Sequence, residues 1–110
     1  MGSPRFDLSP DAVEDLTDIA GNIALRSGEA RANGAIERIW RTLAAISYFP
    51  NAGRRRLDLD GEPFLFPSPP WIILYEPEPT LAGIHVLRIF DGRRDLSRIF
   101  SDYKRPSGKA

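Results

Sequence analysis

Four arginines near the C-terminal end of the chain are the side chains best suited to binding chemistry. Within the stretch RIFDGRRDLSRIF, an apolar strand-like run ends at Asp91-Gly92 and a basic pair follows on the predicted turn. Guanidinium groups on a turn after a strand suit phosphate or carboxylate contacts. The sequence supports partner binding and pairing with the nearby aspartates equally well. The four residues are Arg88, Arg93, Arg94 and Arg98.

The single histidine, His85, lies inside a predicted strand, and we favour a structural role for it. Alternation along the strand predicts that it shares a face with Leu87 and Ile89. The chain has no cysteine and no second histidine, so these residue types cannot complete a transition-metal site around it. No glycine-rich phosphate loop is present, and no serine has a histidine and an aspartate suitably placed for a catalytic triad. The sequence therefore predicts no metal, no cofactor and no catalytic residue.

The acidic residues have a simpler interpretation. Four carboxylates within residues 11–18 share part of one helix surface, and we expect a solvated face that complements the helix dipole. In residues 57–60 leucine alternates with aspartate, which predicts a half-exposed edge strand rather than an acid–base pair. The three arginines at residues 54–56 could bind phosphate or pair with those aspartates, and the sequence leaves both alternatives open.

Two predicted helices form the first half of the scaffold. A short strand at residues 5–8 precedes Ser9-Pro10, a capping serine followed by a proline at the first helical position. Apolar residues then recur at three- and four-residue spacing until Ser27-Gly28, where glycine ends the helix. A second helix runs from near Glu29 to just before Phe49-Pro50, because proline disfavours helical geometry in the preceding residue. The two make an αα-hairpin.

The second half is predicted to be mainly strands. Residues 63–66, 71–75 and 84–90 are strand candidates with short connections, so they should form an antiparallel meander. Residues 95–100 predict a helical turn, and residues 103–110 a loose basic tail. The expected fold class is α+β, in which an N-terminal strand and the helical hairpin pack on one side of a small, mainly antiparallel sheet.

Bulk properties limit the functional classes. A chain of 110 residues, 42% of them hydrophobic, suits one folded domain, which we place at residues 1–110. Fifteen basic and fifteen acidic residues give a net charge of zero, which argues against a general nucleic-acid binder. We also expect no direct sequence-specific binding of nucleic acid and no membrane partner. From Arg88 onward, however, seven Lys/Arg oppose three Asp, so a local basic face is expected. The absence of cysteine, of an apolar signal region and of a membrane-spanning run is compatible with the cytoplasm.

In their order, four segments resemble the RelE/ParE superfamily of bacterial toxins from type II toxin–antitoxin modules. The resemblance covers nearly all of residues 5–100. It rests on LSPDAVEDLTDIA at the start of the first helix, FPNAGRRRLDL after the second helix, FPSPPWIILYE in the aromatic-x-Ile-x-Tyr strand, and RIFDGRRDLSRIF in the last strand and its turn.

The superfamily has two activities, and the resemblance is to the ParE-like branch. RelE-like toxins cleave messenger RNA on the ribosome and place lysines in the second strand, an arginine after the first aromatic residue of the third strand and often a proton donor in the last helix. Here residues 57–66 contain no lysine, Ile72 follows Trp71, and Phe100 occupies the proton-donor place. Arg94 alone keeps its cationic position. ParE-like members instead poison DNA gyrase, and we expect that activity, without catalysis, from this chain.

The resemblance also implies partners for specific residues. It suggests the four arginines as the surface that binds gyrase, and a ParD-like antitoxin that wraps the hairpin and sheet. An apolar groove beside the first helix would suit an amphipathic antitoxin helix, with Ala20, Ile23 and Ala24 as candidate contacts, although a plain core role fits them equally. Two positions depart from ParE-like sequences and reduce basic charge, because Asp91 replaces a common histidine and Glu76 a common arginine.

Two further hypotheses stay open from sequence. One is a ribosome-dependent endoribonuclease with a degenerate site using Arg94, Tyr103 and His85. The other is an interaction protein that has lost its poisoning activity, which the substitutions at Asp91 and Glu76 would accompany.

Overall fold

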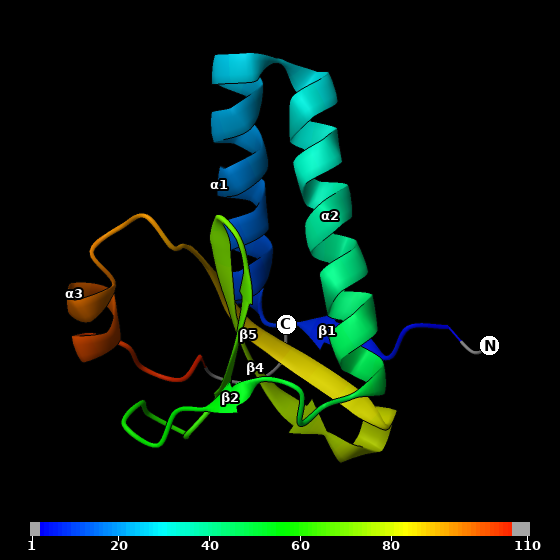
Figure 1. Cartoon of the computed structure of the whole chain (residues 1–110), viewed down its shortest axis with the longest axis vertical. Helices are drawn as coiled ribbons and strands as arrows, with labels where there is room; N and C mark the ends of the chain where they lie inside the picture. The colour runs from blue at the N-terminus through cyan, green and yellow to red at the C-terminus, as the bar shows by residue number, and fades with distance from the viewer. Residues whose placement is uncertain (1–2, 107–110) are drawn as a thin grey trace.

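The computed structural model describes residues 3–106 and shows a helical hairpin packed against a twisted sheet (Figure 1). The expected α+β class, with an N-terminal strand and two helices on a mainly antiparallel sheet, is confirmed. In chain order the elements are β1 (Phe6–Leu8), α1 (Pro10–Ser27), α2 (Glu29–Tyr48), β2 (Arg54–Arg55), β3 (Phe64–Ser68), β4 (Trp71–Glu78), the 3-10 turn η1 (Pro79–Leu81), β5 (Gly83–Asp91) and α3 (Leu96–Ser101).

Both long helices begin and end where the sequence predicts. Ser9 caps α1, because its side-chain oxygen accepts a hydrogen bond from the Ala12 amide at 3.0 Å. The same hydroxyl donates to the carbonyl of Leu87 at 2.7 Å, so the cap also fixes α1 to the sheet. A single residue, Gly28 with φ of 88°, separates α1 from α2. That backbone conformation is open to glycine at low cost, which explains the tight turn between the helices.

Within the described residues, the strands form one sheet in the order β1-β5-β4-β3-β2. β3, β4 and β5 make the predicted antiparallel meander, and β1 pairs with β5 in parallel. At Gly83 a Cβ atom would lie only 1.7 Å from the Arg5 carbonyl oxygen, so the close approach of β1 to β5 requires glycine. The predicted edge strand at residues 57–60 is wrong, because those residues form turns and the edge strand is the preceding pair, Arg54–Arg55.

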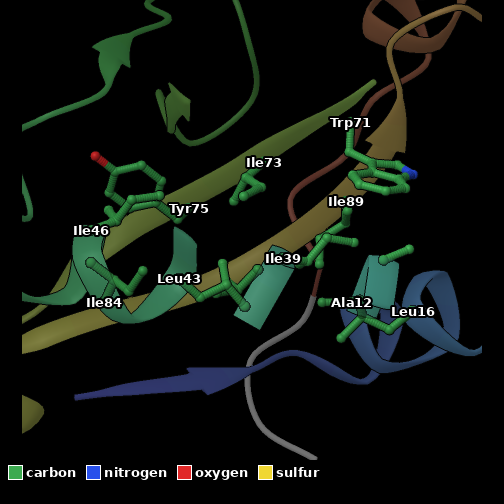
Figure 2. Close-up of a cluster of buried hydrophobic side chains, with 12 residues drawn as sticks. Ala12, Leu16, Ile39, Leu43, Ile46, Trp71, Ile73, Tyr75, Ile84 and Ile89 are labelled. Carbon is green, nitrogen blue, oxygen red and sulfur yellow. The ribbon is translucent and has the colours of Figure 1, made fainter. Parts of the chain in front are cut away.

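Each face of the sheet has its own apolar cluster. The main core lies between the hairpin and the helix-covered face, where side chains of α1 and α2 meet those of β4 and β5 (Figure 2). Val13 follows the apolar spacing of α1 but is about half exposed, and Ala12 is buried instead. We call the opposite side of the sheet the back face. Its cluster consists of Leu59, Leu74, Leu87, Phe90 and Tyr103.

A bulge in β5 changes which side chains share a face. Leu74 of β4 pairs with Arg88 and the next residue, Tyr75, pairs with Val86, so Leu87 is the extra residue. His85 and Leu87 therefore share one face as predicted, which is the back face, but Ile89 does not share it. Ile89 packs in the main core under the helices, because the bulge shifts the alternation by one residue.

The segment from Tyr103 to Pro106 is not the loose tail that the sequence predicts. Tyr103 is buried in the back-face cluster, and Pro106 is buried as well. Arg105 donates through its backbone amide to Asp60 at 2.7 Å and through Nε to Glu76 at 2.9 Å. Residues 107–110 of the predicted tail lie outside the described residues.

Candidate functional site

The turn after β5 and the short helix α3 carry three of the four predicted partner-binding arginines. Arg93 lies on the turn and pairs with Asp91, with Nη2 2.9 Å from Oδ2. This hydrogen-bonded pair holds the pKa of the Asp91 carboxyl below its usual range. Within residues 3–106, the guanidinium groups of Arg94 and Arg98 have no ion-pair or hydrogen-bond partner, and both residues are exposed. Two cations are thus available for an external anionic group.

Arg88 has a different environment from the other three. Its Nε and Nη2 donate to the two oxygens of Asp15 on α1, at 2.7 and 2.9 Å. The backbone amide of Ile89 donates to the same carboxylate at 2.9 Å, and the guanidinium lies 4.6 Å from the Phe90 ring centroid. The hydrogen bond with Asp15 raises the pKa of Arg88. Arg88 therefore fixes α1 to the bulged strand, and its donors are largely occupied.

Asp15 is also the exception among the carboxylates of the first helix. The sequence predicts a solvated acidic face, but the Asp15 side chain is only 13% exposed because it faces β5. Local spacing gives no signal for this pairing, since Arg88 is 73 residues away in the chain.

The other side chains with proton-transfer chemistry are buried on the back face. His85 is 5% exposed, and its Nδ1 is hydrogen-bonded to Asp7 on the neighbouring strand β1. Tyr103 is 7% exposed, and its hydroxyl is the buried side-chain group without a hydrogen-bond partner among the described residues. Burial, with a smaller effect of Glu76, raises the pKa of Tyr103 to about 12. Both rings are almost wholly buried, and the Tyr103 hydroxyl is closed off from solvent.

The predicted antitoxin contacts lie along α1. Ala20, Ile23 and Ala24 are each half-buried, and Ile23 packs against the edge of the main core. The structure thus shows for Ile23 the contact that a core role requires. Their contact with an antitoxin stays a prediction.

An apolar groove lies elsewhere, between the C-terminal half of α2 and β3. Its volume is about 440 Å³. Ile46 is buried, whereas Phe49 beside it is 71% exposed. From the sequence, Phe49-Pro50 is predicted only as the end of the helix. A large aromatic residue one helical turn after the small pair Ala44-Ala45 is the sequence signal that could have indicated this groove. The lining residues are Arg41, Thr42, Ala45, Ile46, Phe49, Ala52 and Phe66.

The described part of the chain has neither a metal-binding cluster nor a membrane-spanning helix. No three His, Asp or Glu side chains of residues 3–106 lie close enough together to hold a metal ion. No helix in the same range is both long and apolar enough to cross a bilayer.

Comparison with known proteins gives matches over most of the chain. The family described as ParE toxin of the type II toxin–antitoxin system parDE matches residues 6–96. The protein Toxin ParE3 of Caulobacter vibrioides is 33% identical over 85 residues, which is 76% of this chain and 81% of that protein. The matched range includes the hairpin, the whole sheet and the arginine turn.

Proposed function

The chain belongs to the ParE toxin family of type II toxin–antitoxin systems. From that premise we propose that it is a cytoplasmic, non-catalytic poison of DNA gyrase. We further propose that a ParD-like antitoxin neutralises it. The burial of His85 and Tyr103 supports this function best. A RelE-like nuclease needs a group that can take the 2′-hydroxyl proton and one that can protonate the leaving oxygen. The His85 ring is only 5% exposed and the Tyr103 hydroxyl is buried, so a substrate would have little access to either group.

The basic turn and α3 are the proposed gyrase-binding surface. Arg94 and Arg98 are exposed without partners in residues 3–106, so binding a target carboxylate or phosphate would break no contact described for them. Arg93 would first have to leave Asp91, or would act by holding the turn in shape. We propose that Arg88 supports this surface from below through Asp15 and does not itself bind the target.

A supercoiling assay with purified gyrase, ATP and relaxed plasmid tests the proposal. Titration of the chain should abolish supercoiling and accumulate linear DNA after proteinase treatment, because a poison traps the cleaved complex. Arg94→Ala with Arg98→Ala should raise the inhibitory concentration about tenfold or more, since the loss of even one charge-assisted contact costs roughly 1.5–3 kcal/mol. The matched control is Arg26→Ala with Arg31→Ala, two exposed cations of the hairpin.

Three other results would lead to different conclusions. Unchanged supercoiling at a large excess of folded chain would contradict gyrase poisoning. Cleavage of transcripts in a translation extract, lost in Arg94→Ala, would support the endoribonuclease alternative instead. Equal effects of both double variants would contradict the assignment of the turn and α3 as the binding surface.

A further inference from the structure

The turn after β5 is held in shape by its backbone. The amide of Gly92 donates to the Pro70 carbonyl at 2.6 Å, and the amide of Arg94 donates to the Asp91 carbonyl at 3.2 Å. At Gly92 a Cβ atom would lie 2.9 Å from the same Pro70 oxygen, so the turn fits closely against the residue before β4. Asp91 itself pairs with Trp71 in the β4–β5 ladder, at the end of β5. The path of the main chain thus has supports that do not involve the Asp91 carboxylate.

The Asp91 carboxylate is bound to Arg93 by both of its oxygens. Oδ1 accepts hydrogen bonds from the Arg93 amide at 2.9 Å and from its Nε at 3.0 Å, and Oδ2 accepts one from Nη2 at 2.9 Å. The pair is therefore bidentate and uses the side of the guanidinium that carries Nε. The hydrogen bond with Arg93 lowers the pKa of the carboxyl, so Asp91 is ionised at neutral pH.

Arg93 differs in this respect from the other arginines of the turn and α3. Asp95, the next carboxylate, accepts hydrogen bonds from the Ser97 hydroxyl at 3.1 Å and from the Arg98 amide at 3.3 Å, so it caps α3. Among residues 3–106, no carboxylate pairs with the guanidinium groups of Arg94 and Arg98. Arg93 is thus the cation of this surface whose charge is offset at contact distance.

The ion pair weakens the attraction of Arg93 for an external anion in two ways. The donors on the Nε side are occupied, and an anion that approached the remaining Nη1 donors would lie close to the negative charge of Asp91. The side chains of Arg93 and Asp91 are 70% and 31% exposed, and exposed pairs contribute little free energy. A target anion therefore displaces Asp91 at a small cost, and the competition is partial.

From these observations we propose that Asp91 is an internal competitor for Arg93 and limits the affinity of the turn and α3 for anionic groups of gyrase. The inference rests on the proposed binding of gyrase by this surface. It assigns Arg93 to target binding, not to holding the turn, because the backbone contacts of Gly92 and Arg94 already do that. Removal of the Asp91 charge frees the Arg93 guanidinium and strengthens the toxin.

The supercoiling assay with purified gyrase tests this inference with Asp91→Asn. Asparagine keeps the shape of the side chain and an oxygen that accepts from the Arg93 amide, but it removes the charge. We expect the inhibitory concentration to fall about two- to fivefold, the range that exposed ion pairs contribute. Damage to the fold would weaken the toxin, so a gain in potency separates release of Arg93 from a structural effect.

Two further variants connect the gain to Arg93. The gain from Asp91→Asn should disappear in an Arg93→Ala background, because no guanidinium is left to release. The matched control is Asp102→Asn, which removes an equal charge from an exposed residue at the end of α3. The inference would be overturned by unchanged or lower potency of Asp91→Asn, by a gain that persists without Arg93, or by an equal gain in the control.

A second measurement reports the competition without gyrase. The Nε–H signals of Arg93 and Arg94 are followed by NMR during titration with inorganic pyrophosphate, used as the anionic probe. In Asp91→Asn the Arg93 signal should respond at several-fold lower pyrophosphate than in the parent chain, with a smaller change for Arg94. An equal response of Arg93 in the two proteins would overturn the inference even if the parent chain poisons gyrase. The expected response with a parent chain that leaves gyrase active would support the competition and contradict the proposed function.

Discussion

Two buried tyrosines show how the contribution of a hydroxyl group to stability depends on one hydrogen bond. The hydroxyl of Tyr75 accepts a hydrogen bond from the Gly53 amide at 2.8 Å, which holds the turn after α2 against the sheet. The hydroxyl of Tyr103 is buried with no partner in residues 3–106. A polar group that is removed from water without compensation costs free energy, whereas a paired one does not.

The matched substitutions Tyr75→Phe and Tyr103→Phe should therefore differ in sign. Tyr75→Phe leaves the Gly53 amide unpaired, and we expect it to lower the free energy of unfolding by about 1–2 kcal/mol. Tyr103→Phe removes an unpaired hydroxyl and keeps the ring, so we expect no loss or a gain of up to about 1 kcal/mol. Urea unfolding of both variants gives the comparison. Equal destabilisation by the two would show that the Tyr103 hydroxyl has a partner in solution.

The buried hydroxyl of Tyr103 also predicts that the free energy of unfolding depends on pH. Tyr103 keeps its proton in the folded chain up to about pH 12, whereas the unfolded chain releases it near the ordinary pKa of 10.0. Proton release thus favours unfolding between these values, and the contribution of Tyr103, present below pH 10, is lost as the pH rises toward 12. The expected loss is roughly 2–3 kcal/mol. The free energy of unfolding, measured at several pH values across this range, should fall less with rising pH for Tyr103→Phe than for the parent chain.

At the level of elements, the contact of α1 with β5 depends on Asp15. This carboxylate accepts hydrogen bonds from Arg88 and from the Ile89 amide, just after the bulge at Leu87. Ser9 binds the same strand through the Leu87 carbonyl. The helix thus provides polar partners for the segment of β5 in which the regular alternation is broken.

Asp15→Ala should destabilise the chain strongly, because it leaves the half-buried Arg88 without its partner. We expect the free energy of unfolding to fall by roughly 2–4 kcal/mol. Asp18→Ala, one turn along on the exposed side of α1, should change it by less than about 0.5 kcal/mol. Denaturation midpoints measure both effects. A midpoint for Asp15→Ala equal to that of Asp18→Ala would mean that the contact with Arg88 does not persist in solution.

Across the whole molecule, the C-terminal segment closes the back face of the sheet. Tyr103 packs on Leu74, Leu87 and Phe90, and Arg105 holds the segment to Glu76 and Asp60. At Gly61 a Cβ atom would lie 2.7 Å from the Arg105 side chain, so the glycine turn and the arginine fit closely against each other. We propose that residues 5–106 unfold as one unit because the two apolar clusters share the same strands.

A chain ending at Asp102 should lose about 3 kcal/mol of stability. Burial of the Tyr103 side chain contributes roughly 1.5–3 kcal/mol, and the partly exposed Arg105–Glu76 pair about 1 kcal/mol or less. The opened back face should bind a hydrophobic dye such as ANS, which reports exposed apolar surface. A chain ending at Pro106 is the matched control. Unchanged stability and dye binding in the shorter chain would contradict closure of the back face by this segment.

The sequence by itself determined the elements whose signals are local. The serine cap and proline at Ser9-Pro10, the glycine stop at Gly28 and the alternating apolar strands act through neighbouring residues, so α1, α2 and the β3–β5 meander were predicted correctly. The ordered motifs likewise pointed to the family that the comparisons show.

Only the tertiary structure decided the features that join distant parts of the chain. The bulge at Leu87 moved Ile89 to the core, Asp15 met Arg88 across 73 residues, and the back face buried Tyr103. The groove over Ala45 also exists only because β3 lies beside α2. Each of these depends on the relative placement of elements, which cap, turn and alternation signals do not specify because they act over a few residues.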